Sequence, residues 1–252
     1  MLEQLQVSCQ TWRAIEIFEG PQALDQTGYI CRFSEPLARQ HVDLLYVSTY
    51  NTDLILVSEE SVERAVTALQ SVAMSSHSSS PIPHFSMNEP HPKFALQDDE
   101  EMMQGDATDT HVLAKLENEL HLVNFSASLV PKFTHALLQL FLFPKDPQTR
   151  FFSYTCYGDQ VTMILDSTDM ESLRPHLDSV TQHDHLWNAI HIQASAEGID
   201  SSVVNFAARV LAQNHIPIYY LSTMNDDFIL VPHDSSVAAL ESLQMITLLN
   251  SR

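Results

Sequence analysis

Apolar residues along this chain form a pattern that occurs twice. His41–Val72 aligns without a gap to His215–Ile246 at an offset of 174 residues, and 13 of the 32 paired positions are identical. In both segments, two apolar-rich runs typical of strands are joined by a tight polar turn, at Tyr50–Thr52 and at Met224–Asp226. This arrangement predicts a β-hairpin in each copy.

Each predicted hairpin has a strand and a helix before it and a second helix after it. The strands begin at Trp12 and Trp187, and apolar residues at helical spacing follow each strand after a loop. The order β-α-β-β-α is a ferredoxin-like unit that lacks only its last strand, and we expect an adjacent segment to supply that strand. In the first copy, the second helix is expected to carry one apolar face made of Val62, Ala65, Val66 and Leu69.

The stretch between the two copies has a related but diverged pattern. We expect strands within Leu120–Leu129, Arg150–Gly158 and Gln160–Asp166, with helices at Lys132–Leu142 and near Met170–Thr181. The chain as a whole therefore predicts an α+β fold of three tandem ferredoxin-like (βαββαβ) units.

Composition sets the boundaries of these units. Residues 75–112 are rich in Ser, Pro and His and then in acidic residues, with few apolar side chains to offset the entropy of ordering. This composition predicts a flexible acidic linker. The predicted units are residues 1–74, 113–184 and 185–252, of which the first and the last hold the repeat.

The charge of the chain excludes several classes of partner. Lys and Arg number 12 against 32 Asp and Glu, which gives a formal net charge of −20. A protein so acidic is not expected to bind nucleic acid or an anionic membrane surface. No apolar run approaches the roughly 18 residues of a membrane span, and the N-terminus has no signal-peptide pattern. We expect a cytoplasmic protein.

Candidate catalytic and metal sites are few. The chain has no GxGxxG, P-loop, GxSxG or HExxH motif. His183, Asp184 and His185 are the only tight cluster of metal-ligating residues, and without a further ligand nearby we interpret them as a solvated loop. Cys31 lies in an amphipathic helix without an identifiable base, which favours packing over reactivity. We expect no enzyme, no metal and no cofactor.

The two hairpin segments, VSTYNTDLILV and YYLSTMNDDFILVP, resemble the ACT domains of the CASTOR family, the cytosolic arginine sensors of the TOR-complex pathway. The middle stretch, with RFFSYTCYGDQVTMILD, matches that family's other type of ACT unit. The family has four ACT units in two pairs, and this chain begins where the second unit starts. The resemblance therefore implies that homodimerisation substitutes for the first unit, or that the chain is a shortened form or an incomplete gene model.

The resemblance also implies an amino-acid site at the interface between paired ACT units. Such a site needs backbone N–H groups at a helix N-terminus for the ligand carboxylate, and Asp or Glu for a cationic side chain. In the last unit, Gly198 permits a turn and Asp200 or Ser201 caps the next helix. By resemblance the ligand contacts are Val42, Asp43, Leu44, Gly198, Ile199, Asp200, Ser201, Val203, Val204, Thr223, Met224, Asp226 and Asp227.

Three of these residues depart from the arginine sensors. Ser201 stands where the sensors have an acidic residue, Val203 where they have a glycine, and Asp43 where they have a small hydroxyl residue. These departures argue against arginine and leave another amino acid, a small metabolite or no ligand. Asp227, the family's partner for the cationic side chain, is kept. Its counterpart Asp53 in the first hairpin leaves open a role in capping the turn.

The tip of the first hairpin has a second implied role. By resemblance, Tyr50, Asn51 and Asp53 correspond to the residues that contact the GATOR regulatory complex when no ligand is bound. The predicted function is therefore a non-catalytic regulatory protein that senses an amino acid and signals by ligand-dependent partner binding. The alternative is a ligand-independent ACT scaffold that has lost amino-acid binding.

Overall fold

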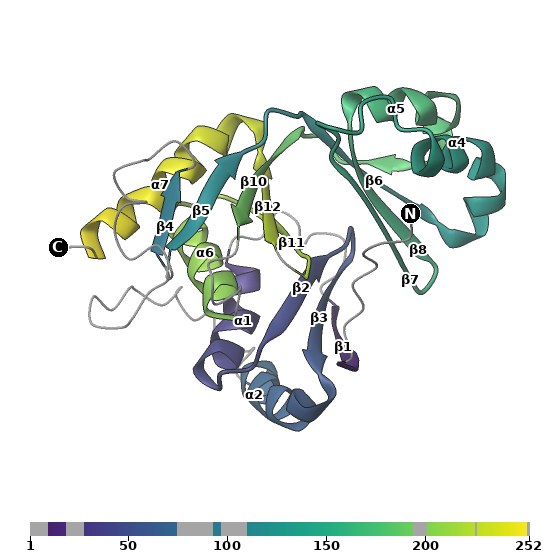
Figure 1. Cartoon of the computed structure of the whole chain (residues 1–252). Helices are drawn as coiled ribbons and strands as arrows, with labels where there is room; N and C mark the ends of the chain where they lie inside the picture. Colours follow the sequence, from purple (N-terminus) through teal and green to yellow (C-terminus); the bar gives the residue numbers. More distant parts are fainter. Residues whose placement is uncertain are drawn as a thin grey trace, which may run out of the picture.

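A computed structural model describes residues 10–18, 28–74, 93–96, 110–193, 201–224 and 226–250 of the chain. These residues form three units of mixed helix and antiparallel strand that share one twisted sheet. Two of the units stand side by side, and the third lies across one face of the pair (Figure 1).

The first unit follows the predicted order closely. Its strands run in the sheet order β1-β3-β2, with α1 and α2 packed against them. Ala65 is fully buried on α2, as expected, whereas Val66 is exposed and the predicted apolar face is wrong at that position. The helix instead packs Val62, Ala68 and Leu69 around Ala65. The elements are β1 (Trp12–Phe18), α1 (Tyr29–Arg39), β2 (Leu44–Ser48), β3 (Thr52–Ser58) and α2 (Val62–Met74).

The last unit repeats this order and gains a strand from the segment before the middle unit. Antiparallel pairing of β5 with β10 fills the position of the missing last strand. A separate segment supplies that strand, as expected, but it lies before the middle unit and is not adjacent to the last unit in sequence. Its elements are β10 (Trp187–Gln193), α6 (Ser201–Gln213), β11 (Tyr219–Ser222), β12 (Asp226–Pro232) and α7 (Ser236–Asn250), with β5 at Thr110–Lys115.

The same pairing corrects the predicted linker. Within 75–112, β4 (Lys93–Leu96) pairs in parallel with β5, so these residues are strands and the prediction of a flexible segment is wrong for them. Their alternation of charged or small residues with Phe94 and Leu96 suits a strand, and the polar composition around them hides this short signal. The remainder of the predicted linker lies outside the described residues, apart from the start of β5.

The middle unit is a complete ferredoxin-like unit with the strand order β9-β6-β8-β7. The helix expected near Met170–Thr181 is shorter, because α5 ends before Pro175 and continues as a 3₁₀ segment at Arg174–Ser179. Proline lacks an N–H group, so Pro175 cannot donate the next helical hydrogen bond. The elements are β6 (Leu120–Ser126), α4 (Val130–Leu142), β7 (Phe152–Tyr157), β8 (Gln160–Asp166), α5 (Ser167–Leu173) and β9 (Thr181–Gln182).

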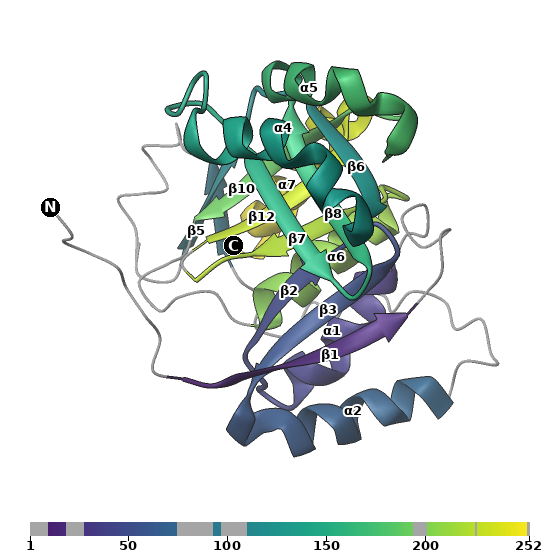
Figure 2. The same cartoon turned by 90° about the vertical axis from the view of Figure 1, so that its right-hand side faces the viewer.

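The first and last units pair through β2 and β11, where Val47 lies opposite Leu221. These residues are 174 positions apart, so equivalent residues of the repeat meet and the two units are related by an approximate twofold axis. One face of the joined sheet carries α1 and α6, which pack side by side. The opposite face packs on the sheet of the middle unit, and their shared core includes Leu122, Ile164 and Trp187 (Figure 2).

Candidate functional site

Each hairpin of the paired units contains a tyrosine hydrogen-bonded to an aspartate. The hydroxyl of Tyr46 donates to Oδ2 of Asp53 at 2.7 Å, and the hydroxyl of Tyr220 donates to Oδ2 of Asp227 at 2.6 Å. Two equivalent hydrogen bonds join β2 and β11 across the axis, each from a backbone N–H group of one strand to a serine hydroxyl of the other. The N–H of Tyr46 donates to Ser222 Oγ at 2.9 Å, and that of Tyr220 donates to Ser48 Oγ at 3.2 Å.

Both aspartates are buried, with exposed fractions of 9% for Asp53 and 1% for Asp227. Burial raises the pKa of each carboxyl group from 3.8 to about 6, because the charged form loses hydration. The tyrosine hydroxyl lowers each pKa by a smaller amount, since it donates to the carboxylate. The paired units therefore hold two carboxyl groups, at equivalent positions, that titrate near pH 6.

The contact between α1 and α6, which forms part of the seam between the first and last units, contains a second set of buried hydrogen bonds. Nδ2 of Asn205 donates to the carbonyl oxygen of Cys31 and to Ser34 Oγ, both at 3.3 Å. Arg209 donates to Oδ1 of Asn205 at 2.8 Å and lies 3.6 Å from Glu35. Cys31 is buried, which raises the pKa of its thiol to about 11 and keeps it protonated. This agrees with its interpretation as a packing residue.

Part of the predicted ligand site is brought together in this region. The segment before and at the start of β2 and the first turns of α6 join one buried core, and α6 contacts β2 directly. Ser201 is buried at the first position of α6, whereas Asp43 is exposed. Gly198, Ile199 and Asp200 lie outside the described residues. The predicted contacts within the core are Val42, Leu44, Val203 and Val204.

The residues predicted on the second hairpin do not all face the same side of the sheet. Asp227 points to the side of the helices, and Asp226, its neighbour on β12, points to the opposite face. There, Asp226 lies 3.2 Å from Nε2 of His191. Thr223 closes the turn, donating from its N–H to the carbonyl oxygen of Asp226 at 2.8 Å, and Met224 is 62% exposed at the tip. Only Asp227 of this group faces the core that contains Val203.

The first hairpin tip packs against the middle unit. The N–H of Tyr50 donates to Thr162 Oγ1 on β8 at 3.0 Å, and the Tyr50 side chain packs on the core between the two sheets. Asn51 is half-buried and Asp53 is buried. Tyr50, which the resemblance implies as a partner contact, is therefore partly covered in this arrangement, because the middle unit packs on the face of the sheet on which it lies.

Several residues that shape this region were not identified from the sequence. Tyr46 and Tyr220 hold the two aspartates, and Ser48 and Ser222 join the two units. All four are identical between the copies of the repeat, so the alignment contained this signal. Asn205 and Arg209 differ from their equivalents, and only the packing of α1 on α6 reveals their contacts.

Other kinds of site are not found in the described part of the chain. In the ranges that the structure describes, no three His, Cys, Asp or Glu side chains are grouped as metal ligands would be. No helix among these ranges is both long enough and apolar enough to cross a membrane.

Comparison with known proteins agrees with this architecture. The ACT domain pattern matches residues 7–71 and 182–245, which include all but the last residue of each copy of the repeat. The cytosolic arginine sensor for mTORC1 subunit 1 of Homo sapiens is 24% identical over 266 residues, covering 96% of this chain and 78% of the relative. The corresponding protein of Pongo abelii is 23% identical over 265 residues, with the same coverage of both chains.

Aspartate kinases are among the solved structures that the chain matches. The enzyme of Synechocystis superimposes with a TM-score of 0.42 at 14% identity, over 96% of this chain and 40% of that one. The regulatory subunit of the Thermus thermophilus enzyme gives a TM-score of 0.38 at 13% identity, over 53% of this chain and 95% of that one. From the matches to both copies of the repeat and the alignment along nearly the whole chain, the protein belongs to the ACT domain family, as a member similar to the cytosolic arginine sensors.

Proposed function

We propose that this protein is a non-catalytic, cytoplasmic regulator that binds a free amino acid at the seam between its first and last ACT units. The observation that carries the proposal is the pairing of those units through β2 and β11. That pairing places the start of β2 in one core with the first turns of α6. The similarity to proteins named as arginine sensors supports an amino acid as the ligand class.

The chemistry of the seam suits the common part of an amino acid. The backbone N–H groups at the start of α6 and the helix dipole favour a carboxylate near Ser201. Asp43, exposed beside Val42 before β2, is available to a cationic group. A ligand that contacts both α6 and β2 would bind the paired arrangement of the two units more tightly than another arrangement. It would stabilise the paired arrangement by the difference between the two binding free energies.

Asp227 bears on the identity of the ligand. Its carboxyl group already accepts from Tyr220 and is nearly inaccessible to solvent. A guanidinium group would have to displace neutral donors from a carboxyl whose pKa is raised to about 6. The proposed ligand is therefore an amino acid recognised mainly through its backbone groups, with arginine disfavoured.

Signalling is proposed to pass through the Tyr50 hairpin. A partner of the GATOR type that contacts Tyr50, Asn51 and Asp53 would compete with the middle unit for the hairpin tip, because Tyr50 bonds to Thr162 in the present arrangement. Ligand binding at the neighbouring seam would then change partner affinity by favouring one of the two arrangements. The residues that carry this coupling would be those of β2 and β3, which connect the seam to the tip.

A specific observation favours the alternative of a ligand-independent scaffold. The Tyr220–Asp227 bond is matched by the Tyr46–Asp53 bond in the other copy, and Val203 is fully buried. Such duplication is expected of a bond that stabilises the hairpin, whether or not a ligand binds nearby. The scaffold keeps the ACT pairing and binds its partner without an amino acid.

Thermal unfolding in the presence of each of the twenty amino acids at millimolar concentration distinguishes the two functions. A ligand at about 100 times its Kd stabilises the native state by about 2.7 kcal/mol, which raises the Tm of a chain of this size by roughly 5–10 °C. Under the sensor proposal one amino acid gives such a shift. Under the scaffold alternative none does, and the sensor proposal is wrong.

Matched variants then locate the site. Asp43→Asn removes a charge at the proposed seam with little effect on folding, because Asp43 is exposed. Asp227→Asn and Asp53→Asn make the same chemical change at equivalent positions of the repeat. We expect Asp43→Asn to reduce the Tm shift. Asp227→Asn reduces it only if the ligand displaces Tyr220 from this carboxyl group, and Asp53→Asn leaves it intact. Equal loss in both hairpin variants would place the ligand elsewhere.

A further inference from the structure

The first and last units differ at the outer edge of one pair of equivalent strands. In the last unit, β10 lies between β12 and β5, and β5 completes the sheet of the unit. In the first unit, the equivalent strand β1 pairs with β3 on one side, and no strand in the described part of the chain pairs with its other side. Figure 2 shows β1 in the foreground, in front of β3 and above α2. The outer edge of β1 is therefore an open strand position.

The backbone of β1 is in register to accept such a strand. Strand β1 meets β3 in the register in which β10 meets β12, so each β1 residue corresponds to the β10 residue 175 positions later. The N–H of Leu116, directly after β5, donates to the carbonyl oxygen of Ala189 at 2.8 Å. In an antiparallel ladder, residues paired in this way exchange both of their backbone hydrogen bonds. Both backbone groups of Ala14, the equivalent of Ala189, therefore point to the open side of β1.

Apolar side chains near the open position are less buried than their equivalents in the last unit. Leu243 on α7, a helix that contacts β5, is fully buried, whereas the equivalent Leu69 on α2 is only partly buried. On the strands, Ile190 is fully buried and the equivalent Ile15 is partly buried. Val66 on α2 is 37% exposed. The missing strand therefore leaves an apolar strip that a strand in the position of β5 would cover.

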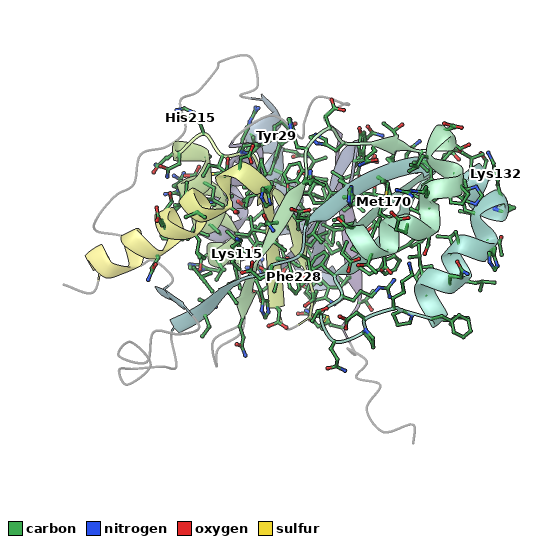
Figure 3. All side chains as sticks on the ribbon, turned by 90° about the horizontal axis from the view of Figure 1, so that it is seen from above. Tyr29, Lys115, Lys132, Met170, His215 and Phe228 are labelled. Atoms are coloured by element: carbon green, nitrogen blue, oxygen red, sulfur yellow. The ribbon has the colours of Figure 1, made fainter. Side chains whose placement is uncertain are left out.

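The strand that fills this position in the last unit indicates the chemistry of the occupant. The sequence of β5, THVLAK, contains Lys115 and no acidic residue, although the chain has a net charge of −20. Leu113 of β5 is fully buried in the core that it shares with α7. Figure 3 shows Lys115 and Phe228 in one region of the last unit, on the two strands that flank β10. In the first unit, Glu60 and Glu63 at the start of α2 are exposed, so a basic segment is also favoured there.

We propose that the outer edge of β1 binds an extended basic segment of another protein, which joins the sheet as a strand antiparallel to β1. The segment takes the position that β5 has beside β10. Backbone hydrogen bonds to Ala14 and to every second residue after it hold the segment in place. An apolar side chain at the position of Leu113 covers the strip formed by Ile15, Val66 and Leu69. Such strand addition draws affinity from the main chain and specificity from alternate side chains.

The charged residues of β1 do not prevent this pairing. Arg13 forms an ion pair with Glu59, and Glu16 accepts a hydrogen bond at 2.9 Å from the hydroxyl of Tyr157 in the middle unit. Both side chains are therefore held by groups of the same chain. Strand β3 separates β1 from β2 and the seam, so the segment binds whether or not an amino acid is bound.

Fluorescence anisotropy with a labelled peptide of the β5 sequence, THVLAKL, tests the proposal on the full chain. We expect saturable binding in the micromolar range. The same peptide with Leu113→Asp should bind at least about tenfold more weakly, because a carboxylate would then meet the apolar strip. The peptide with Lys115→Glu should also bind more weakly, since it loses its basic charge. A wild-type chain that binds no peptide, or that binds the Leu113→Asp peptide equally well, overturns the proposal.

Variants of the chain locate the binding edge. Ala14→Pro removes an N–H group that points to the open side, at a strand edge where proline is tolerated, and should abolish peptide binding. Ala14→Ser keeps that N–H group and should bind normally. If the peptide binds Ala14→Pro as tightly as the wild-type chain, it binds elsewhere, and the proposal is wrong. It is equally wrong if no peptide binds and Ala14→Pro instead changes the sedimentation of the chain, which would assign the edge to a second copy.

A second pair of variants tests the apolar strip without changing the strand. Val66→Asp and Thr67→Asp add the same charge at neighbouring exposed positions of α2. We expect Val66→Asp to weaken peptide binding about tenfold and Thr67→Asp to change it by less than about twofold. Thermal unfolding of each variant shows that it is folded. Equal effects of the two substitutions would mean that the peptide responds to charge alone and does not cover the strip.

Discussion

In the first copy of the repeat, α1 buries four of its eleven residues, whereas α6, at the equivalent place in the last copy, buries eleven of its thirteen. The difference lies in the residues of the two helices, since each packs against two others and α1 carries more charged side chains. Helix α6 packs between α1 and α7, while α1 packs on α6 and α2. The sequence of α6 agrees with this, since small and apolar residues surround the helix on nearly all sides.

The two hairpins, in contrast, form the same buried hydrogen bonds and differ only in the surroundings of their tips. The Tyr46–Asp53 and Tyr220–Asp227 bonds are nearly identical in length. At the tips, Tyr50 packs on the middle unit, while its equivalent Met224 is exposed. The two copies therefore share the residues that form the same hydrogen bond within each unit or across the axis. They differ at positions where the neighbouring residues differ.

The largest effect is expected from exchanging the charges of the seam. Glu35→Arg alone and Arg209→Glu alone each place like charges together in a largely buried contact, and each should lower the free energy of unfolding by about 3 kcal/mol. The double variant restores an opposite pair at equivalent positions and should recover at least half of that loss. Urea unfolding of all four proteins gives the coupling energy.

Exchange of Glu171 and Arg174, an exposed ion pair in the middle unit, is the control and should change stability by less than about 0.5 kcal/mol. If the double variant at the seam is no more stable than the single variants, the two positions are not equivalent across the axis.

An intermediate effect is expected from the pH dependence of the buried aspartates. Because the native pKa of about 6 is above the unfolded value of 3.8, each group stabilises the fold fully below pH 3.8, and that contribution is lost as pH rises through 6. Asp53→Asn and Asp227→Asn should each remove the contribution of one carboxyl group to the pH dependence of the free energy of unfolding. That contribution is about 1–3 kcal/mol between pH 4 and 7. Urea unfolding across this range measures it.

Asp159→Asn, at an exposed residue of the middle unit, provides the comparison for a general effect of charge. Unequal shares from Asp53 and Asp227 would show that the two hairpins differ inside as well as at their tips. A variant whose stability follows the wild-type pH profile would show that the carboxyl group in question is not the one that titrates.

The smallest effects are expected at the hairpin tips. Tyr50→Ala should lower the free energy of unfolding by about 1–2 kcal/mol, since the side chain packs between two sheets. Met224→Ala should change it by less than about 0.5 kcal/mol, because the side chain is mostly in solvent. Thermal unfolding of both variants at one protein concentration is sufficient. Equal losses would contradict the difference between the tips.

The order of elements within each unit could be predicted from the residues alone, because strand and helix periodicity are local properties of the chain. The sequence was sufficient to predict the repeat, the hairpin turns and the need for a last strand from another segment. Short strand β4 was missed because four residues in a polar region carry too weak a signal. The end of α5 was misplaced because the predicted helix was carried past Pro175, where the α-helical hydrogen bonding stops.

For the candidate site, periodicity and resemblance identified residue types but not which of them share a face. Val42, Leu44 and Val203 meet in one core only because β2 and β11 join two units that are 174 residues apart in sequence. Asp226 and Asp227, adjacent in the chain, are separated by the alternation of a strand. Covering of the Tyr50 tip depends on the middle unit docking on the other face of the sheet.

Local pattern thus suffices for most helices and strands of each unit, because the periods of 3.6 and 2 residues are set by backbone geometry within a few neighbours. Which units pair, which edges stay free and which carboxyl groups lose their hydration are properties of contacts between segments far apart in sequence. These depend on how much apolar surface each arrangement buries and on the polar groups that it pairs. Only the assembled chain, with α6 packed between two other helices and β7 at the end of the strand order, settles them.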